Sequence, residues 1–262
     1  MMEKIVSDKT TTTKPNPGEP VISVTGLRKS FGDNHVLQGF NLTLNRGENL
    51  VVLGKSGSGK SVLIKCIVGL LQPDEGSINV LGKDVTGLSH QELDEIRVKI
   101  GFLFQNSALY DSMTVRENLE FPMRRHWSEL TPEESLEIVS EALSNVGLLH
   151  AMDMMPSELS GGMRKRIGLA RTLIMKPEIV LYDEPTTGLD SVTGTEIAQL
   201  MLDLQSKYKT SSIIISHDMH VAKVTSNRVI VLMDGMNYAE GTFDQLSRSD
   251  DPKVKQFFQT II

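Results

Sequence analysis

Alternating apolar and polar positions begin near Val21 and continue through the first third of the chain. They predict short strands at 21–25, 39–44 and 77–81, because each run is bounded by Gly, Asp or Asn, which are typical of turns. Residues 1–19 contain Thr and Pro but few apolar side chains, which is typical of a flexible tail. The pattern therefore predicts a tail followed by an antiparallel β-subdomain.

Four later runs are apolar at almost every position: 51–53, 179–182, 213–216 and 229–233. Continuous apolar runs are expected where strands are buried on both faces, as in a parallel sheet flanked by helices. The first run leads into a glycine-rich loop and a helix predicted at 61–70. We therefore predict an α/β fold with a mostly parallel core sheet.

The middle third of the chain has the period of helices. Residues 131–134 have the sequence of a capping box with proline at the first helical position, and apolar residues then recur at helical spacing up to Gly147. A similar capping sequence at 89–92 predicts an earlier helix. We expect an α-helical subdomain over about 106–165, inserted between strands, and a helical C-terminal tail over 247–262.

Composition narrows the class of protein. The 262 residues carry a formal net charge of −6 and no dense Lys/Arg tract, which argues against a nucleic-acid partner. The longest apolar runs are far shorter than the roughly 20 residues that a membrane helix needs, so any membrane role requires a partner. The single cysteine, Cys66, permits no internal disulfide and indicates a reducing cytoplasm; we interpret it as a core residue.

The loop after the run at 51–53 has the phosphate-loop pattern G-x-x-x-x-G-K-S. Its glycines let backbone N–H groups surround phosphate oxygens at a helix N-terminus. The lysine is expected to reach the β- and γ-phosphates, and the serine hydroxyl to bind Mg²⁺. The predicted nucleotide-binding residues are Gly54, Lys55, Ser56, Gly57, Ser58, Gly59, Lys60 and Ser61.

Two carboxylates follow the apolar run at 179–182. Asp183 would hold Mg²⁺ at the carboxyl end of a buried strand, where open α/β sheets place ligands. Glu184, one residue further, is a candidate general base for the attacking water. The alternative, a strand end that is merely capped by acidic residues, is less favoured because the pair lies downstream of a phosphate loop.

Two further polar residues end predicted strands. His217 follows the run at 213–216 and could contact the γ-phosphate and orient Glu184 or the water; alone, such a histidine would more often be structural. Gln105 follows a strand predicted at 100–104 and could bind Mg²⁺ or water, with an ordinary surface amide as the alternative. Both are therefore candidate catalytic residues.

A second glycine-rich segment, Leu-Ser-Gly-Gly-Met at 159–163, stands about a hundred residues after the phosphate loop. One phosphate loop already completes a nucleotide site within its own chain. A second anion-binding segment therefore suggests a site that another copy of the chain completes.

Together these motifs resemble the ATPase subunit of ATP-binding cassette (ABC) transporters, within the P-loop NTPase fold, over about residues 20–245. The resemblance implies one ATPase domain over 20–246, with Walker motifs at 54–61 and 179–184, a Q-loop at Gln105 and a switch at His217. It also implies a homodimer that encloses two ATP molecules, each bound between one phosphate loop and the partner's signature. The remaining residues that it assigns to nucleotide binding are Phe31 (which otherwise could be core), Ser160, Gly161, Gly162 and Asp190.

A narrower resemblance is to the Mla-type ATPases of Mce-associated lipid transporters, and residues 104–122 carry most of it. Tyr110 and the Arg-His-Trp sequence at 125–127 depart from that pattern. The resemblance implies ATP hydrolysis that drives phospholipid trafficking at the cytoplasmic face of the inner membrane, with permease subunits and an Mce-domain protein as partners. We expect residues 106–125, through Ala108, Leu109, Tyr110 and Met113, to grip a permease helix, although Leu109 could equally pack internally.

Alternatives remain open at this stage. An ABC importer for an amino acid or a metal shares the Pro-x-Glu-Leu-Ser-Gly-Gly sequence at 156–162. A non-transport ABC ATPase is the other alternative. Translation-associated members resemble two cassettes in one chain, and DNA-repair members split their motifs around a long coiled coil; this chain has one cassette and no such heptads.

Overall fold

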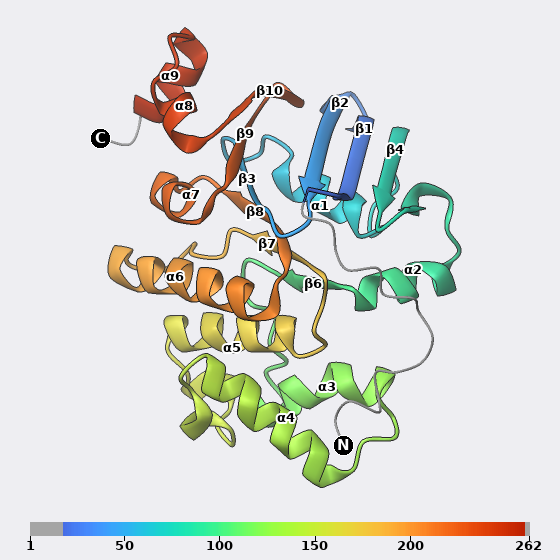
Figure 1. Cartoon of the computed structure of the whole chain (residues 1–262), viewed down its shortest axis with the longest axis vertical. Coiled ribbons are helices and arrows are strands. Elements are labelled where there is room, and N and C mark those ends of the chain that lie inside the picture. The colour runs from blue at the N-terminus through green and yellow to red at the C-terminus, as the bar shows by residue number, and fades with distance from the viewer. Residues whose placement is uncertain (1–17, 260–262) are drawn as a thin grey trace.

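The computed structural model describes residues 18–259 of the chain (Figure 1). Most of the tail expected at 1–19, and the last three residues, 260–262, lie outside the described residues. The strands form two sheets, one antiparallel and one mainly parallel.

The antiparallel sheet is built from the N-terminal part of the chain in the order β2-β1-β4-β5. Its strands are β1 (Pro20–Phe31), β2 (Asn34–Asn45), β4 (Glu75–Val80) and β5 (Lys83–Asp84). Strand β1 is longer than predicted because the turn signal at Gly26 is a β-bulge inside it, and β2 also begins before the predicted residue 39. There the Gly26 N–H donates to Asn41 Oδ1 at 2.8 Å, and pairing resumes beyond it.

The second sheet has six strands in the order β10-β9-β3-β8-β7-β6. The five from β9 to β6 run parallel, and β10 pairs antiparallel with β9 at one edge. This confirms the predicted α/β fold with a mostly parallel core sheet. Its strands are β3 (Asn49–Leu53), β6 (Ile100–Leu103), β7 (Ile179–Asp183), β8 (Ser211–Ser216), β9 (Arg228–Met233) and β10 (Met236–Gly241).

Both faces of the parallel sheet are buried, which explains its continuous apolar runs. In β3, Leu50 and Val52 belong to a core shared with the antiparallel sheet and with helices α1 (Lys60–Ile67) and α2 (His90–Val98). Val51 and Leu53 point to the opposite face, into a core formed with the later helices.

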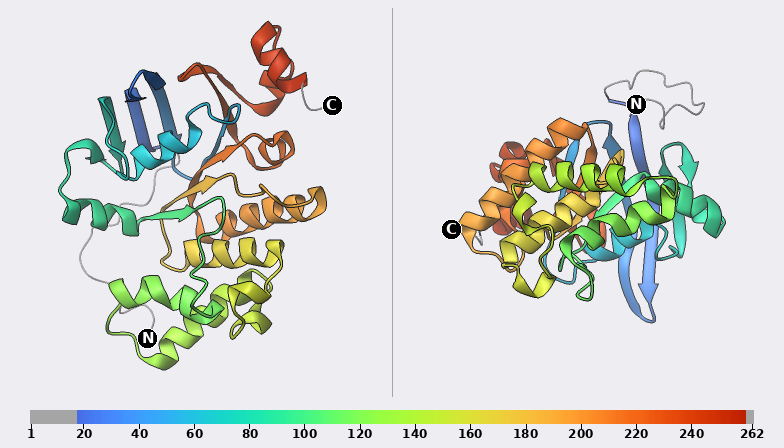
Figure 2. Two further views of the ribbon diagram at one scale, coloured as in Figure 1. Left: turned by 180° about the vertical axis from the view of Figure 1, so that it is seen from behind. Right: turned by 90° about the horizontal axis from the view of Figure 1, so that it is seen from below.

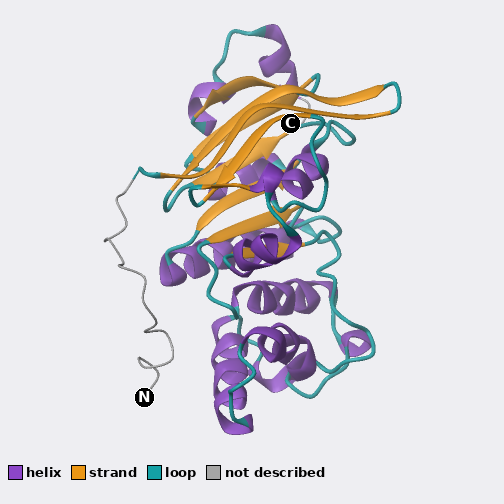
Figure 3. Cartoon of the chain, turned by 90° about the vertical axis from the view of Figure 1, so that its right-hand side faces the viewer, coloured by secondary structure: helices purple, strands orange, loops and turns teal. Residues whose placement is uncertain are grey.

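Helices inserted between β6 and β7 form the helical subdomain, which in Figure 3 lies at the end of the molecule opposite the antiparallel strands. They are α3 (Val115–His126), α4 (Pro132–Asn145) and α5 (Gly161–Leu173), with short 3₁₀ turns at Leu149–Ala151 and Pro156–Glu158. The predicted capping boxes open α2 and α4. Helix α5 continues past residue 165, because its later residues pack on β6 and the core.

The C-terminal third of the chain completes the second core and one edge of the molecule (Figure 2). Its helices are α6 (Ser191–Tyr208), α7 (Met219–Thr225), α8 (Phe243–Ser247) and α9 (Pro252–Gln259). The rings of Phe243 and Phe258 meet 5.4 Å apart and join α8 to α9. Over residues 18–259, none of the helices has the length and hydropathy that a membrane crossing needs.

Candidate active site

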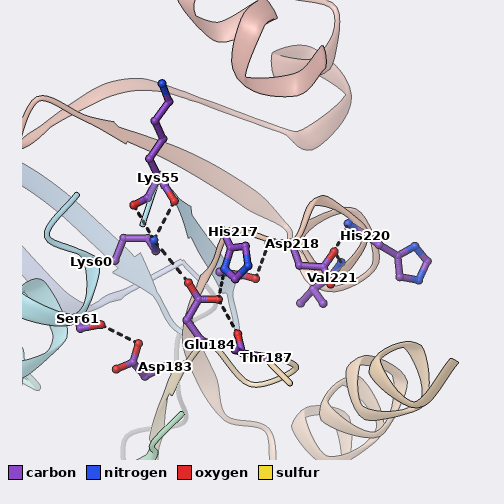
Figure 4. A network of polar contacts seen from close by, with 12 residues as sticks. Lys55, Lys60, Ser61, Asp183, Glu184, Thr187, His217, Asp218, His220 and Val221 are labelled. Carbon is purple, nitrogen blue, oxygen red and sulfur yellow. Dashed lines mark hydrogen bonds and ion pairs between the residues drawn. The ribbon is translucent and has the colours of Figure 1, made fainter. Parts of the chain in front are cut away.

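The strand order brings the predicted catalytic segments to one edge of the parallel sheet. Strand β8 lies between β3 and β7, so the carboxyl ends of these three neighbours are adjacent. The phosphate loop follows β3, Asp183 ends β7 with Glu184 directly after it, and His217 follows β8. Figure 4 shows side chains from all three segments pointing toward one another.

The phosphate loop has a shape that only glycine allows at two positions. Gly59 has φ +102°, and a Cβ there would lie 2.7 Å from Val36 Cγ1. A Cβ on Gly54 would lie 2.5 Å from the hydroxyl of Ser58. That hydroxyl is buried and has no hydrogen-bond partner among the described residues, so the loop retains an unused polar atom. The loop ends where α1 begins, at Lys60, and places a helix N-terminus toward the site.

Lys60 lies in the centre of the site and is only 6% exposed. Its ammonium donates to the carbonyl oxygens of Gly54 at 2.8 Å and Lys55 at 3.1 Å. It also forms an ion pair with Glu184 Oε1 at 3.5 Å. The ammonium therefore bridges two carbonyls within the phosphate loop and faces the candidate base, Glu184.

Glu184 is held by three side chains and by its own backbone. Its Oε2 accepts from Thr187 Oγ1 at 3.3 Å and lies 2.8 Å from His217 Nδ1. Because a carboxylate only accepts, that contact requires the hydrogen on Nδ1. Glu184 has φ +50°, an uncommon conformation for a residue other than glycine, and such conformations cluster at functional sites.

Ser61 and Asp183 form the position predicted for a metal. The Ser61 hydroxyl donates to Asp183 Oδ1 at 3.0 Å, and burial raises the pKa of Asp183. A hydroxyl and a carboxylate are oxygen ligands of the type that Mg²⁺ prefers. Within residues 18–259, no group of three or more His, Cys, Asp or Glu could hold a metal by itself. This set therefore fits Mg²⁺ that takes its other ligands from nucleotide phosphates and water.

Gln105 is the catalytic candidate whose side chain the structure does not bring into the cluster. Strand β6 ends at Leu103, one residue earlier than predicted, and the Gln105 side chain is exposed. In the described part of the chain, no hydrogen bond joins that side chain to Ser61 or Asp183. Its main-chain carbonyl instead accepts a hydrogen bond from Lys165. Its metal and catalytic roles remain predictions.

The signature segment forms a separate, exposed helix N-terminus. Ser160 caps α5, accepting from the Met163 N–H at 3.2 Å, and both Ser160 and Gly161 are exposed. A Cβ on Gly162 would lie 2.9 Å from Thr193 Cγ2, so glycine lets α5 approach α6. Over the described residues, none of the hydrogen bonds of this segment reaches the phosphate loop of the same chain.

Two other predicted nucleotide ligands also lie outside the cluster. Asp190 caps α6, accepting from the N–H groups of Val192 and Thr193, each at 3.0 Å. The Thr193 hydroxyl and these amides hold the pKa of Asp190 below its usual range. Phe31 ends β1 and is 49% exposed, which rules out the alternative of a core residue.

Part of the segment 104–122 lines a groove between the core and the helical subdomain, through Phe104, Ala108, Tyr110, Phe121 and Pro122. Its volume is about 380 Å³, and the rings of Tyr110 and Phe121 pack 4.8 Å apart on its wall. Buried Asn118 supports it by exchanging hydrogen bonds with the main chain of Tyr110, at 2.7 and 3.1 Å. Tyr110 and Ala108 are exposed as expected, whereas Leu109 packs against the core.

Two residues at the site were missed by reasoning from the sequence. Thr187 bonds Glu184, and nothing in the local pattern signals that contact. Lys165 is buried in α5 beside the Gln105 and Glu184 main chains. A signal for it did exist, because Lys165 lies four and eight residues before Leu169 and Leu173, on the apolar stripe of the helix.

A phosphate loop between a buried strand and a helix, facing a Ser–Asp pair and a Glu–His pair, defines a P-loop ATPase. The family model for ABC transporters matches residues 37–187. The chain therefore belongs to the ABC transporter family, as its ATP-binding cassette.

Similar chains agree with that family. Over 236 residues the chain is 41% identical to the probable ribonucleotide transport ATP-binding protein Mkl of Mycobacterium tuberculosis, which covers 90% of this chain; the chain spans only 66% of Mkl. It is 37% identical to the intermembrane phospholipid transport system ATP-binding protein MlaF of Haemophilus influenzae, covering 91% of this chain and 90% of MlaF.

Two further comparisons bear on cargo and assembly. The methionine import ATP-binding protein MetN of Rhizobium johnstonii is 39% identical, covering 85% of this chain and 61% of MetN. Among solved structures, the dimeric ATP-binding cassette MJ0796 bound to ADP and phosphate has a TM-score of 0.78 at 33% identity. That match covers 85% of this chain and 98% of MJ0796.

Proposed function

We propose that this chain is the ATP-hydrolysing subunit of an ABC transporter that moves phospholipid between membranes. The observation that carries the ATPase part is the cluster of Lys60, Glu184 and His217 at the carboxyl edge of the parallel sheet. These groups are a phosphate-binding cation, a base for water and a histidine that orients the base.

In the proposed reaction, the phosphate loop binds the triphosphate and Lys60 turns from Glu184 to the β- and γ-phosphates. Glu184 accepts a proton from the attacking water, and the water oxygen forms a bond to the γ-phosphorus. At the same time the bond between the γ-phosphorus and the β–γ bridging oxygen breaks. ADP and phosphate leave. His217 holds the carboxylate in place, and Ser61 and Asp183 would hold Mg²⁺, which supplies charge neutralisation on the phosphates.

The exposed signature segment supports a homodimer with two shared nucleotide sites. Ser160, Gly161 and Gly162 form a helix N-terminus, which favours anions, and the phosphate loop of the same chain does not engage it. The cassette MJ0796, which shares this fold, is dimeric with ADP and phosphate bound. In the proposed dimer each signature faces the partner's γ-phosphate, with Asp190 beside it, while Phe31 stacks on adenine and Gln105 senses the metal and the partner.

The groove between the core and the helical subdomain is proposed as the docking site for a short cytoplasmic helix of a permease. Its exposed rings of Tyr110 and Phe121 are anchors of the type that protein interfaces use. Arg97 and Arg125 also line it, and both pair with Asp94 of the same groove, at 3.2 and 2.7 Å. A permease bound at this groove would hold the chain at the cytoplasmic face of the inner membrane, which is the location we propose.

Phe121→Asp should weaken permease binding without reducing ATP hydrolysis by the free subunit. Placing a carboxylate in an aromatic anchor typically costs 2 kcal/mol or more, which corresponds to roughly 30-fold in affinity. Co-purification with the permease measures this loss of binding. The control is Leu149→Asp, at an exposed residue outside the groove. Equal permease recovery for both variants would argue against docking at this groove.

The phospholipid cargo is proposed from two observations. MlaF, named for intermembrane phospholipid transport, matches this chain across 90% of its own length, and the groove segment at 104–122 resembles Mla-type ATPases. The names of Mkl and MetN indicate ribonucleotide and methionine instead. An Mce-domain protein is the further partner expected for a lipid cargo.

The cargo is tested by purifying the ATPase with its membrane partners and identifying bound small molecules by mass spectrometry. We expect phospholipid in stoichiometric amounts, together with an Mce-domain subunit. ATP turnover that responds to methionine or to ribonucleotides, with no lipid retained, would point to the alternative importers.

A further inference from the structure

Lys165 is a buried cation for which the proposed reaction has no role. It lies one turn into α5, is only 5% exposed, and forms no ion pair within the described residues. Its ammonium instead contacts two main-chain carbonyls, those of Gln105 and Glu184, the latter at 3.5 Å. A buried ammonium needs hydrogen-bond acceptors to offset its desolvation, and these two carbonyls supply them.

The two carbonyls belong to the segments that flank the candidate site. Gln105 begins a loop in which Ser107 and Ala108 both have positive φ, at +59° and +48°. Arg171, further along α5, donates to the carbonyls of the same two residues, each at 2.8 Å. Helix α5 therefore holds this unusual loop with two basic side chains.

The second contact bears on the candidate base. Glu184 has a left-handed backbone, which the surroundings must maintain. On one side its N–H donates to the Ile215 carbonyl at 2.9 Å. On the other, its carbonyl faces the Lys165 ammonium. The backbone conformation of Glu184, and hence the direction of its carboxylate, depends on both.

Helix α5 packs closely against the end of β6 and the loop that follows it. A Cβ on Gly168 would lie 2.9 Å from Leu103 Cδ1 and from Ser107 Cβ, so the helix cannot move independently of the loop. The first turn of the same helix carries the signature residues Ser160 and Gly161. Lys165 thus stands where the signature helix, the Gln105 loop and the Glu184 main chain meet.

We propose that Lys165 is a positioning residue for ATP hydrolysis, whose ammonium fixes the Glu184 main chain relative to the Gln105 loop and the signature helix. This inference rests on the proposed role of Glu184 as the base. Electrostatic attraction between an ammonium and a carbonyl oxygen supplies the force, and a low local dielectric strengthens it. Removing the charge should let the carboxylate drift from the water without disturbing the phosphate loop.

The test compares Lys165→Met, Lys165→Gln and Lys165→Arg in the full chain, with Lys223→Met, an exposed lysine on α7, as control. Misplacing a catalytic group by about 1 Å costs up to roughly 100-fold. We expect kcat of Lys165→Met to fall about 10-fold or more while KM for ATP stays within about 2-fold. Lys165→Arg, which keeps a charged donor, should restore most of kcat, and Lys165→Gln should be intermediate.

A role in packing alone would give a different pattern. If Lys165→Met does not fold, the comparison of Arg with Gln decides, and equal kcat for these two would overturn the proposal. Wild-type kcat for folded Lys165→Met would also overturn it. Glu184→Gln, measured alongside, separates the positioning role of Lys165 from the proposed ATPase function. If Glu184→Gln stops turnover but Lys165→Met does not, only the positioning role fails. If Glu184→Gln hydrolyses ATP normally, the proposed function itself is wrong.

Discussion

Glu184→Gln is expected to stop ATP turnover while leaving ATP binding and ATP-dependent dimerisation intact. Glutamine has nearly the same shape but cannot take a proton from water, and general-base catalysis contributes roughly 10²–10⁴ to a rate. Phosphate release in the presence of saturating ATP should therefore fall by about that factor. Among the described residues, Glu184 is the carboxylate that both the phosphate-loop lysine and His217 contact.

The same substitution should not weaken nucleotide binding. Glu184 forms an ion pair with Lys60, and glutamine removes that competitor for the lysine. Equilibrium titration with ATP should therefore give affinity equal to or tighter than that of the wild type, and size-exclusion chromatography with ATP should show the dimer. Glu141→Gln, at an exposed residue of α4, is the matched control. Steady-state hydrolysis near the wild-type rate would exclude Glu184 as the base.

Lys60→Ala should reduce affinity for ATP, and this is the second large effect. Hydrogen bonds to charged groups contribute about 1.5–3 kcal/mol, so loss of the ammonium should weaken binding by roughly 10- to 150-fold. The same ammonium also donates hydrogen bonds to the carbonyls of Gly54 and Lys55 and so constrains the loop. The alanine variant therefore loses both a phosphate ligand and a constraint on the loop.

Fluorescence titration with a labelled ATP analogue measures this change. The control is Lys83→Ala, which removes an exposed lysine of β5 that pairs with Glu95 of α2 at 3.4 Å. Thermal unfolding without nucleotide shows whether the loop constraint matters for stability. An unchanged dissociation constant for Lys60→Ala would mean that the lysine does not reach the triphosphate.

Local patterns in the sequence predicted much of the fold. The capping boxes at Ser89 and Thr131 are present as expected, because they depend on residues within one helical turn. Buried strands were found from their apolar runs, although α1 ends at Ile67 instead of residue 70 because Gly69, with φ +68°, follows its last turn. The long β1 was underestimated, since a bulge and a turn have the same glycine signal.

In the candidate site, too, some residues were predicted from local sequence patterns and others were not. Lys60 and Ser61 were identified from the phosphate-loop pattern. Asp183, Glu184 and His217 were identified because they follow predicted strands, and the structure brings all five residues together. Gln105 was chosen by the same rule, but its side chain lies outside the cluster. The contact of Lys165 with two carbonyls joins α5 to residues 60 and 19 positions away along the chain, so no local pattern predicts it.

By itself, then, the order of residues determined the chemistry that is available: a loop whose glycines can surround phosphate, a lysine at its end, and acidic and histidine side chains after apolar strands. Only the tertiary structure decided which of these groups meet, because the neighbours β3, β8 and β7 come from distant parts of the chain. It also placed the signature away from its own phosphate loop and directed the base through a strained backbone. Those outcomes depend on packing across the sheet and on long-range hydrogen bonds, which the local periodicity of a sequence does not contain.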